Sequence, residues 1–157
     1  MRELILLRHA HAESASAGQS DHERPLSATG LQEARDAGEW LRKQGLRPDR
    51  VLYSPAARTR DTVLALGEIG AGELREEASI YDASVGDLIA LADAHRDANR
   101  LLLVGHNPGL EQLAALLHSG QSGDHRGMPP AGIAVLHLPA DVAIEPGIAT
   151  LAAFWWP

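Results

Sequence analysis

Cysteine is absent from this chain of 157 residues. Its absence excludes disulfide bonds, thiolate ligands to a metal ion and a cysteine nucleophile. Near the start of the sequence, the apolar run LILL at residues 4–7 is short and lies between the charged residues Glu3 and Arg8. A signal peptide or a membrane-spanning helix needs a longer uncharged run. We therefore expect a soluble, cytoplasmic protein that has no membrane partner.

Positive charge is also scarce, because 14 Lys and Arg residues face 21 Asp and Glu residues and the formal net charge is −7. An extended nucleic-acid surface requires an excess of basic residues, so we expect no nucleic-acid partner. Phosphate chemistry would have to take place in a small local pocket. The length suits one domain with one proper core, and we expect a single domain over residues 1–157.

Short aliphatic runs alternate with helical patterns along the chain, which is typical of an α/β domain. We predict strands at residues 3–8, 50–53, 74–77, 100–105, 132–138 and 148–154. The run RLLLVG at 100–105 indicates a central strand that is buried on both faces. A turn at residues 145–147 indicates that the last two strands pair antiparallel at an edge. The expected fold class is a three-layer α/β/α sandwich with a mostly parallel sheet.

Three apolar stripes with helical spacing lie between the predicted strands. They consist of Leu31, Ala34, Gly38 and Leu41; of Val85, Leu88, Ile89 and Ala92; and of Leu110, Leu113, Ala114 and Leu117. We expect each stripe to face the core. Two stretches, 10–28 and 119–131, lack any periodicity, and loops of this length in a compact domain are usually functional or mobile.

Charged and polar side chains follow the predicted strands directly. Arg8 and His9 come at the end of the first strand, His106 comes after RLLLVG, and Arg58 comes shortly after the second strand. Open α/β sheets bind their ligands beyond the carboxyl ends of the strands. We therefore expect these four side chains to contribute to one site.

Two helices are predicted to begin beside this site. Ser54 and Asn107 are residue types that cap helices, and the proline that follows each of them, Pro55 or Pro108, suits the first helical position. The free N–H groups and positive dipole ends of both helices would then face His9. This arrangement predicts an anion-binding pocket.

A phosphoryl group is the anion that fits these residue types best. Guanidinium groups match phosphate oxygens, and an imidazole can attack phosphorus or donate a hydrogen bond to it. The sequence contains no glycine-rich P-loop, zinc-binding spacing or serine nucleophile elbow as a competing motif. We expect phosphoryl chemistry that uses neither a metal ion nor another cofactor.

Five segments together resemble the histidine phosphatase superfamily, with its phosphoglycerate mutase-like fold, and within it the short SixA-type phosphohistidine phosphatases. LILLRHAHA resembles the Arg-His-Gly opening of the family, and RPLSATGLQEA resembles its Pro-Leu-Ser/Thr pattern with a glycine downstream. SPAARTRDT is similar to the second-arginine motif, LLLVGHNPGLEQLA to the second-histidine motif, and GMPPAGIAVLHL to the penultimate strand of the short branch. The resemblance covers nearly the whole chain.

The resemblance implies a role for each of the four side chains. His9 would be the nucleophile that becomes phosphorylated, and Arg8 and Arg58 would clamp the phosphate. His106 would be the second histidine, which stabilises the transferring group. The reaction would then proceed through a covalent phosphohistidine on the protein itself.

The sequence departs from the family pattern at two places. The glycine after the nucleophile is Ala10, whose backbone carbonyl could still fix the tautomer of His9. The general acid, a glutamate after the third strand in the family, has only Asp82 near the matching place, with Glu76 and Glu77 upstream. Asp82 is therefore the candidate acid, and its alternative role is that of an exposed turn carboxylate.

The poor match to the general acid of the family bears on the substrate class. An alkoxide leaving group needs a positioned acid, whereas an imidazole leaving from phosphorus needs less help. The sequence therefore favours phosphohistidine on a partner protein, and the short chain favours an open site. A small-molecule phosphomonoesterase of the same superfamily is the alternative.

Two further alternatives come from other classes of protein. His9 and His11 have the H-x-H spacing of some metal-dependent hydrolases, although Arg8 and Arg58 would repel a cation there. A module that binds phosphoryl groups without catalysis is the other alternative, and the presence of both histidines and both arginines argues against it. The sequence assigns no role to His22.

Overall fold

The computed structural model describes residues 2–123 and 127–157. Within these ranges a sheet with the strand order β3-β2-β4-β1-β5-β6 forms the centre of the molecule. Its strands are β1 (Arg2–Arg8), β2 (Arg50–Tyr53), β3 (Leu74–Glu76), β4 (Arg100–Gly105), β5 (Ile133–Leu138) and β6 (Thr150–Trp155). The pairs β3–β2, β2–β4 and β4–β1 are parallel, whereas β5 runs antiparallel to β1 and β6 antiparallel to β5. The predicted strands are all present, and their bounds differ from the prediction by at most two residues.

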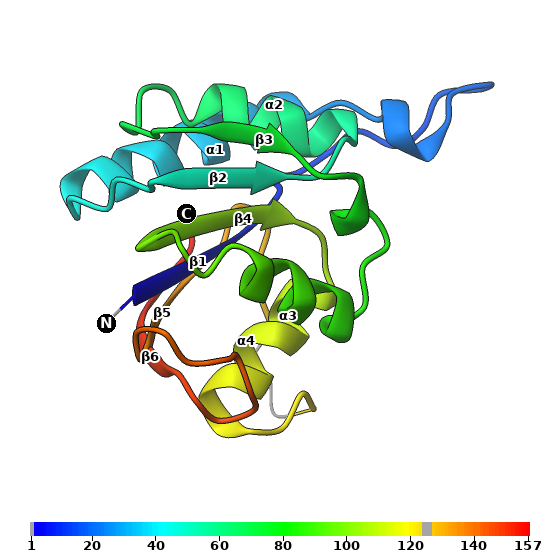
Figure 1. Cartoon of the computed structure of the whole chain (residues 1–157). Helices are drawn as coiled ribbons and strands as arrows, with labels where there is room; N and C mark the ends of the chain where they lie inside the picture. The colour runs from blue at the N-terminus through cyan, green and yellow to red at the C-terminus, as the bar shows by residue number, and fades with distance from the viewer. Residues whose placement is uncertain (1, 124–126) are drawn as a thin grey trace.

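Helices cover both faces of this sheet (Figure 1). They are α1 (Ala28–Lys43), α2 (Ala57–Ala65), α3 (Val85–Ala94) and α4 (Gly109–Ser119), with short 3-10 turns η1 (Asp21–Glu23) and η2 (Ala78–Ile80). The buried apolar side chains of α1, against which Val63 and Ala65 of α2 pack, belong to one apolar cluster. Those of α3 and α4 belong to another, on the opposite face of the sheet. The architecture is the predicted three-layer α/β/α sandwich with a mostly parallel sheet.

The position of β1 explains why its sequence is apolar throughout and does not alternate between apolar and polar residues. Leu4 and Leu6 pack in the cluster with α3 and α4, while Ile5 and Leu7 pack in the cluster with α1 and α2. All four are at most 2% exposed, because side chains of a strand alternate between two covered faces. The predicted helical stripes also face the core, with the exception of Leu31, which is 36% exposed on α1.

The two aperiodic stretches have different structures. Residues 10–27 leave the end of β1, contain η1, and return to α1 through an isolated bridge between Ala12 and Leu26. The second stretch begins at the end of α4, and its residues 124–126 lie outside the described residues. No helix within the described ranges is long and apolar enough to cross a membrane.

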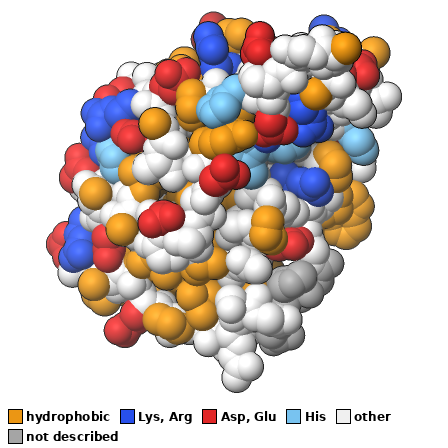
Figure 2. All heavy atoms as spheres, turned by 90° about the vertical axis from the view of Figure 1, so that its right-hand side faces the viewer, with side chains coloured by type: hydrophobic (Ala, Val, Ile, Leu, Met, Phe, Trp, Pro, Cys, Tyr) orange, Lys and Arg blue, Asp and Glu red, His pale blue; other side chains and the backbone are white. Residues whose placement is uncertain are grey.

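The carboxyl ends of the parallel strands all point toward the side of the molecule on which η1 and η2 lie (Figure 1). Figure 2 views the molecule from this side, and histidine side chains gather there beside basic and acidic ones. The candidate site lies at this edge, as the sequence predicts for an α/β sheet.

Candidate active site

The pairing of two central strands brings the two candidate histidines together. Strands β1 and β4 are parallel neighbours with Arg8 opposite Gly105, so His9 and His106 leave the sheet at the same level. Their ring centroids are 5.3 Å apart and their planes meet at 61°. Two residues that are distant in the sequence thus form one pair of imidazoles at the edge of the sheet.

His9 is a neutral imidazole with a defined tautomer. Its Nδ1 lies 2.7 Å from the carbonyl oxygen of Ala10, and because a carbonyl can only accept, Nδ1 carries the proton. Burial lowers the pKa of His9 to about 4, and the positive charges of Arg58 and Arg8 contribute to this lowering. At neutral pH the Nε2 atom therefore carries a lone pair, which is the nucleophilic form of the ring. Alanine in place of the glycine of the family leaves the carbonyl available for this contact.

His106 is also neutral, and its ring forms a hydrogen bond with a buried hydroxyl group. Its Nε2 is 2.8 Å from Oγ of Ser54, a residue with no exposed surface. Burial, together with the nearby His9 and Arg58, lowers the pKa of His106 to about 3. Ser54 therefore fixes the orientation of the second ring beside the first.

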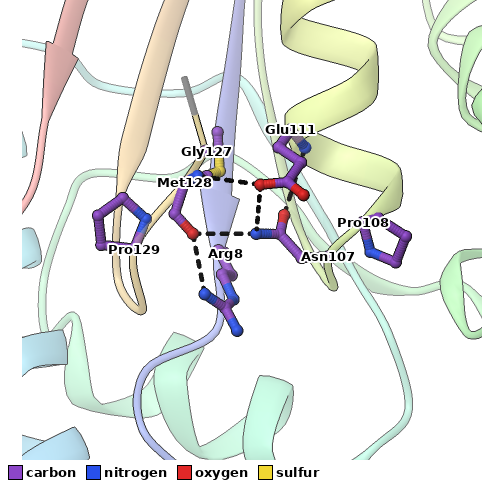
Figure 3. A pocket seen from close by; sticks show the side chains of 7 residues that line it. All are labelled: Arg8, Asn107, Pro108, Glu111, Gly127, Met128 and Pro129. Carbon is purple, nitrogen blue, oxygen red and sulfur yellow. Dashed lines mark hydrogen bonds between the residues drawn. The ribbon is translucent and has the colours of Figure 1, made fainter. Parts of the chain in front are cut away.

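Arg8 lines an open pocket of about 570 Å³ next to the first turn of α4 (Figure 3). Its Nη1 donates to the carbonyl of Met128 at 2.9 Å, and the side chain of Asn107 donates to the same carbonyl at 2.9 Å. The carboxylate of Glu111 accepts from Asn107 and from the N–H of Met128. The Nε of Arg8 is buried without a hydrogen-bond partner among the described residues. Such a donor is costly to leave unpaired, so it is suited to bind an oxygen of an anionic ligand.

Arg58 lies in the first turn of α2 and is only 7% exposed. Its guanidinium donates to the backbone carbonyl of Asp21 at 2.8 Å and to the carboxylate of Asp21 at 3.0 Å. The hydroxyl of Tyr81 donates to the same carboxylate at 2.5 Å. Sequence reasoning predicted the arginine but missed both partners. Asp21 lies in an aperiodic stretch, and its place just before the RPLSATG motif was the one signal that could have marked it.

The RPLSATG motif holds the backbone that follows His9. Oγ of Ser27 accepts from the N–H of Gly30 at 3.0 Å, which caps α1, and donates to the carbonyl of His11 at 3.2 Å. Gly30 lies against this carbonyl so closely that a Cβ atom would come within 2.0 Å of its oxygen. The serine and the glycine of the motif therefore fix the chain just after His9.

Helix α2 begins later than the sequence predicts. Its first residue is Ala57 with Ala56 as the cap, whereas the prediction placed Ser54 at the cap and Pro55 at the first position. Oγ of Ser54 bonds to His106 and accepts from the N–H of Ala56 in the turn that precedes the helix. Arg58 still lies at the second position of the helix.

Helix α4 also begins one position beyond the predicted start. Its first residue is Gly109, and Pro108 occupies the cap position in place of Asn107. Asn107 nevertheless accepts from the N–H of Glu111 at 3.3 Å, so its side chain satisfies a free donor of the first turn from one residue further out.

The candidate acid Asp82 lines a second pocket, of about 330 Å³, to which His106 also contributes. Its φ of 55° is in the left-handed region, which aspartate tolerates better than most residues. Of the upstream alternatives, Glu76 forms an ion pair with Arg60 at 3.7 Å, and Glu77 directly precedes η2. The structure therefore brings Asp82 into a pocket shared with the second histidine.

His11 and His22 have partners outside the pair of catalytic candidates. The Nδ1 of His11 is 2.7 Å from the carboxylate of Glu33, which also accepts from the N–H of His11 at 3.0 Å. The ring of His22 stacks on Tyr81 with centroids 3.8 Å apart. Within residues 2–123 and 127–157, no three His, Asp or Glu side chains are grouped where they could hold a metal ion. The H-x-H pair of the sequence thus has no third ligand in this part of the chain.

Comparison with known proteins identifies relatives over the whole length of the chain. The family model described as histidine phosphatase superfamily (branch 1) matches residues 4–99. An uncharacterized protein of Mycobacterium tuberculosis is 37% identical over 94% of this chain and 98% of its own length.

Solved structures of similar fold include histidine phosphatases. A protein from Nakamurella multipartitia assigned as a phosphohistidine phosphatase SixA has a TM-score of 0.86 and 34% identity, over 99% of this chain and 96% of that chain. The protein histidine phosphatase SixA complexed with tungstate has a TM-score of 0.81 and 25% identity, over 98% of this chain and 96% of that chain. These likenesses confirm the predicted phosphoglycerate mutase-like fold.

Proposed function

We propose that this chain, which belongs to the histidine phosphatase superfamily (branch 1), removes phosphoryl groups from phosphohistidine side chains of a partner protein. One observation carries this proposal. His9 is neutral, its Nδ1 proton is engaged by the carbonyl of Ala10, and its lone pair on Nε2 lies in the field of two arginines. A phosphoryl group bound by these guanidinium groups would present its phosphorus to a nucleophile.

In the first step, Nε2 of His9 attacks phosphorus in line and the bond between phosphorus and the substrate imidazole breaks. The substrate ring carries a proton on its other nitrogen, so it leaves as neutral imidazole. The guanidinium groups of Arg8 and Arg58 and the ring of His106 stabilise the charge on the non-bridging oxygens. In the second step, water attacks phosphorus, the bond to His9 breaks, and inorganic phosphate leaves. Neither step requires a metal ion.

The buried Nε of Arg8 supports the binding of an anion at this place. It has no acceptor in the described protein, and a non-bridging phosphoryl oxygen would supply one. The solved structure of SixA with tungstate, a tetrahedral oxyanion, supports the same kind of ligand for a protein of this fold.

Two observations favour a phosphohistidine over a phosphate ester. The pocket beside Arg8 is open, so a side chain presented by another protein could enter it. Glu76, one of the three carboxylates considered as an acid, is paired with Arg60. An imidazole leaving group has the smaller need for such an acid.

The alternative, a small-molecule phosphomonoesterase, is favoured by the position of Asp82. This carboxylate shares the second pocket with His106, where it could protonate a leaving alkoxide. A panel of substrates therefore decides between the two functions.

The test is a side-by-side measurement of kcat/KM on a protein phosphorylated on histidine, on alkyl phosphates and on an aryl phosphate. We expect the phosphohistidine protein to be the best substrate and the variant His9→Ala to be inactive on all of them. A wild-type reaction quenched in alkali should carry a phosphate at His9 that is stable in base and labile in acid. A chelator present throughout should leave the rates unchanged.

Other outcomes would overturn the proposal. Efficient turnover of alkyl esters without any action on phosphohistidine would establish the phosphomonoesterase. Full activity of His9→Ala would show that His9 is not the nucleophile. Activity that is lost with chelator and restored by zinc would support a metal-dependent hydrolase, and binding of phosphate without turnover would leave a non-catalytic module.

A further inference from the structure

Asp21 contacts three side chains at the mouth of the site. Its carboxylate accepts from Arg58 at 3.0 Å, from Arg24 at 2.9 Å and from the hydroxyl of Tyr81 at 2.5 Å. Its backbone carbonyl accepts a second hydrogen bond from Arg58 at 2.8 Å. A single residue of η1 therefore joins two arginines and an aromatic residue that belong to different segments of the chain.

These contacts leave Arg58 little freedom. An arginine side chain loses most of its rotamer freedom when it is fixed in one geometry. Asp21 holds both terminal nitrogens of the guanidinium, Nη1 through its carbonyl and Nη2 through its carboxylate. The loss of entropy is thus incurred on folding, before any phosphoryl group binds.

Asp21 remains charged over the whole physiological pH range. The hydrogen bonds from Tyr81, Arg24 and Arg58 hold the pKa of this carboxyl well below its usual value. A permanent negative charge at this place would repel a phosphoryl group in direct contact. Asp21 is therefore suited to orient the arginine from behind and not to bind the substrate itself.

Tyr81 holds the same carboxylate from the other side of the site. The ring of Tyr81 meets the ring of His106 edge to face, with centroids 5.6 Å apart and planes at 89°. Its hydroxyl is fixed by Asp21. Tyr81 thus holds the carboxylate that orients Arg58, while its ring packs against the second histidine.

We propose that Asp21 is a positioning residue for phosphoryl transfer, which acts by holding the guanidinium of Arg58 in the geometry that binds the phosphoryl oxygens. This inference rests on the proposed function of the site. Removal of the carboxylate would leave Arg58 mobile, and an arginine that must be ordered during binding stabilises the transition state less well.

A double-mutant cycle distinguishes the positioning of Arg58 by Asp21 from a purely structural role of Asp21 in the segment 10–27. Asp21→Ala should lower kcat/KM by about 10-fold or more, while Asp36→Ala, which removes a carboxylate from α1, should leave it unchanged. In the double variant Asp21→Ala with Arg58→Ala, the loss should be no greater than in Arg58→Ala alone. Tyr81→Phe, which keeps the ring and removes one hydrogen bond to Asp21, should cause a smaller loss of a few-fold.

Binding of vanadate, measured by calorimetry on the same variants, tests the inference without turnover. Asp21→Ala should weaken vanadate binding in the background of Arg58 and have no effect in the background of Arg58→Ala. Additive losses, or wild-type activity and vanadate affinity in Asp21→Ala, would overturn the positioning role. If the wild type binds vanadate with this coupling but hydrolyses no phosphorylated substrate, the proposed function fails and the positioning role stands. A wild type that binds no vanadate would overturn both.

Discussion

The hydroxyl oxygen of Thr62 accepts a hydrogen bond from the backbone N–H of Ala10 at 3.2 Å. The same hydroxyl donates to the carbonyl of Arg58 at 2.7 Å. Both Thr62 and Ala10 are fully buried, so this hydroxyl ties the backbone after His9 to the helix that carries Arg58. The second-arginine motif thus contributes a structural residue one helical turn after the arginine itself.

This contact gives the first prediction. Thr62→Val removes the acceptor and leaves the N–H of Ala10 buried without a partner, which typically costs about 1–3 kcal/mol. We expect the free energy of unfolding in urea to fall by about that amount and kcat to fall several-fold. Thr62→Ser keeps the hydroxyl and serves as the control, with kcat near that of the wild type. Equal kcat values in the valine and serine variants would show that the hydroxyl does not position the nucleophile.

Gly30 gives a prediction about stability. In Gly30→Ala the new Cβ atom would meet the carbonyl oxygen of His11 at 2.0 Å, so α1 and the backbone after the nucleophile would have to move apart. We expect a loss of about 2 kcal/mol or more, together with a loss of activity. Gly86→Ala is the matched control. It also lies in the first turn of a helix, but its Cβ would have 3.8 Å to the nearest atom, so its melting temperature should stay constant or rise.

The titration of His9 and His106 gives a prediction about pH. The pKa values of about 4 for His9 and about 3 for His106 mean that both rings stay neutral as the pH falls through the ordinary histidine range. Protonation of His9 removes the nucleophilic lone pair, so the rate of phosphoryl transfer should fall only as the pH drops toward about 4. NMR chemical shifts of the ring carbons should report these values directly. In urea both rings should titrate near the ordinary value of about 6.5, and the same value in the folded protein would contradict the burial argument.

His106 can be compared with another histidine on the same segment of chain. His106→Ala removes a group that we expect to stabilise the charge on the transferring phosphoryl group, and kcat/KM should fall by about 100-fold or more. His118→Ala, at the exposed end of α4, should leave kcat/KM unchanged. Unfolding midpoints should be comparable in the two variants. If His106→Ala has near-normal activity per folded molecule, the role of His106 is structural only.

Asp82 distinguishes the two substrate classes. Asp82→Asn should hardly change the hydrolysis of a phosphohistidine protein, because the leaving imidazole needs little protonation, but it should slow any hydrolysis of alkyl phosphates. Asparagine tolerates the φ of 55° at this position, so the backbone should keep its shape. An equal loss on both substrates would mean that Asp82 does not act as the acid.

The strands and the neighbouring positions of three site residues could be predicted from the sequence. Continuous apolar runs mark strands buried on both faces, and Arg8, His9 and His106 come directly at the ends of two such strands. Because parallel strands end at the same edge of a sheet, a local pattern was sufficient to bring these residues together. Arg58 was found by the resemblance of its segment to a known motif and by its place after β2.

The contacts that orient these side chains could not be predicted from the sequence. Arg8 bonds to the backbone carbonyl of Met128, and Arg58 bonds to Asp21, which is 37 residues away in the chain. Any residue can supply a backbone carbonyl, so such an acceptor leaves no mark in the residue pattern. The starts of α2 and α4 were also misplaced. Near α2 the hydroxyl of Ser54 bonds to His106, which is 52 residues away in the chain.

The sequence by itself therefore determined the fold class and which residue types meet at the edge of the sheet, because both depend on periodicity and on the ends of strands. Only the tertiary structure decided that Asp21 and Tyr81 belong to the site, since they reach it from a loop and from the turn after η2. It also decided that both histidines are neutral, because burial depends on how the layers pack and not on neighbours along the chain.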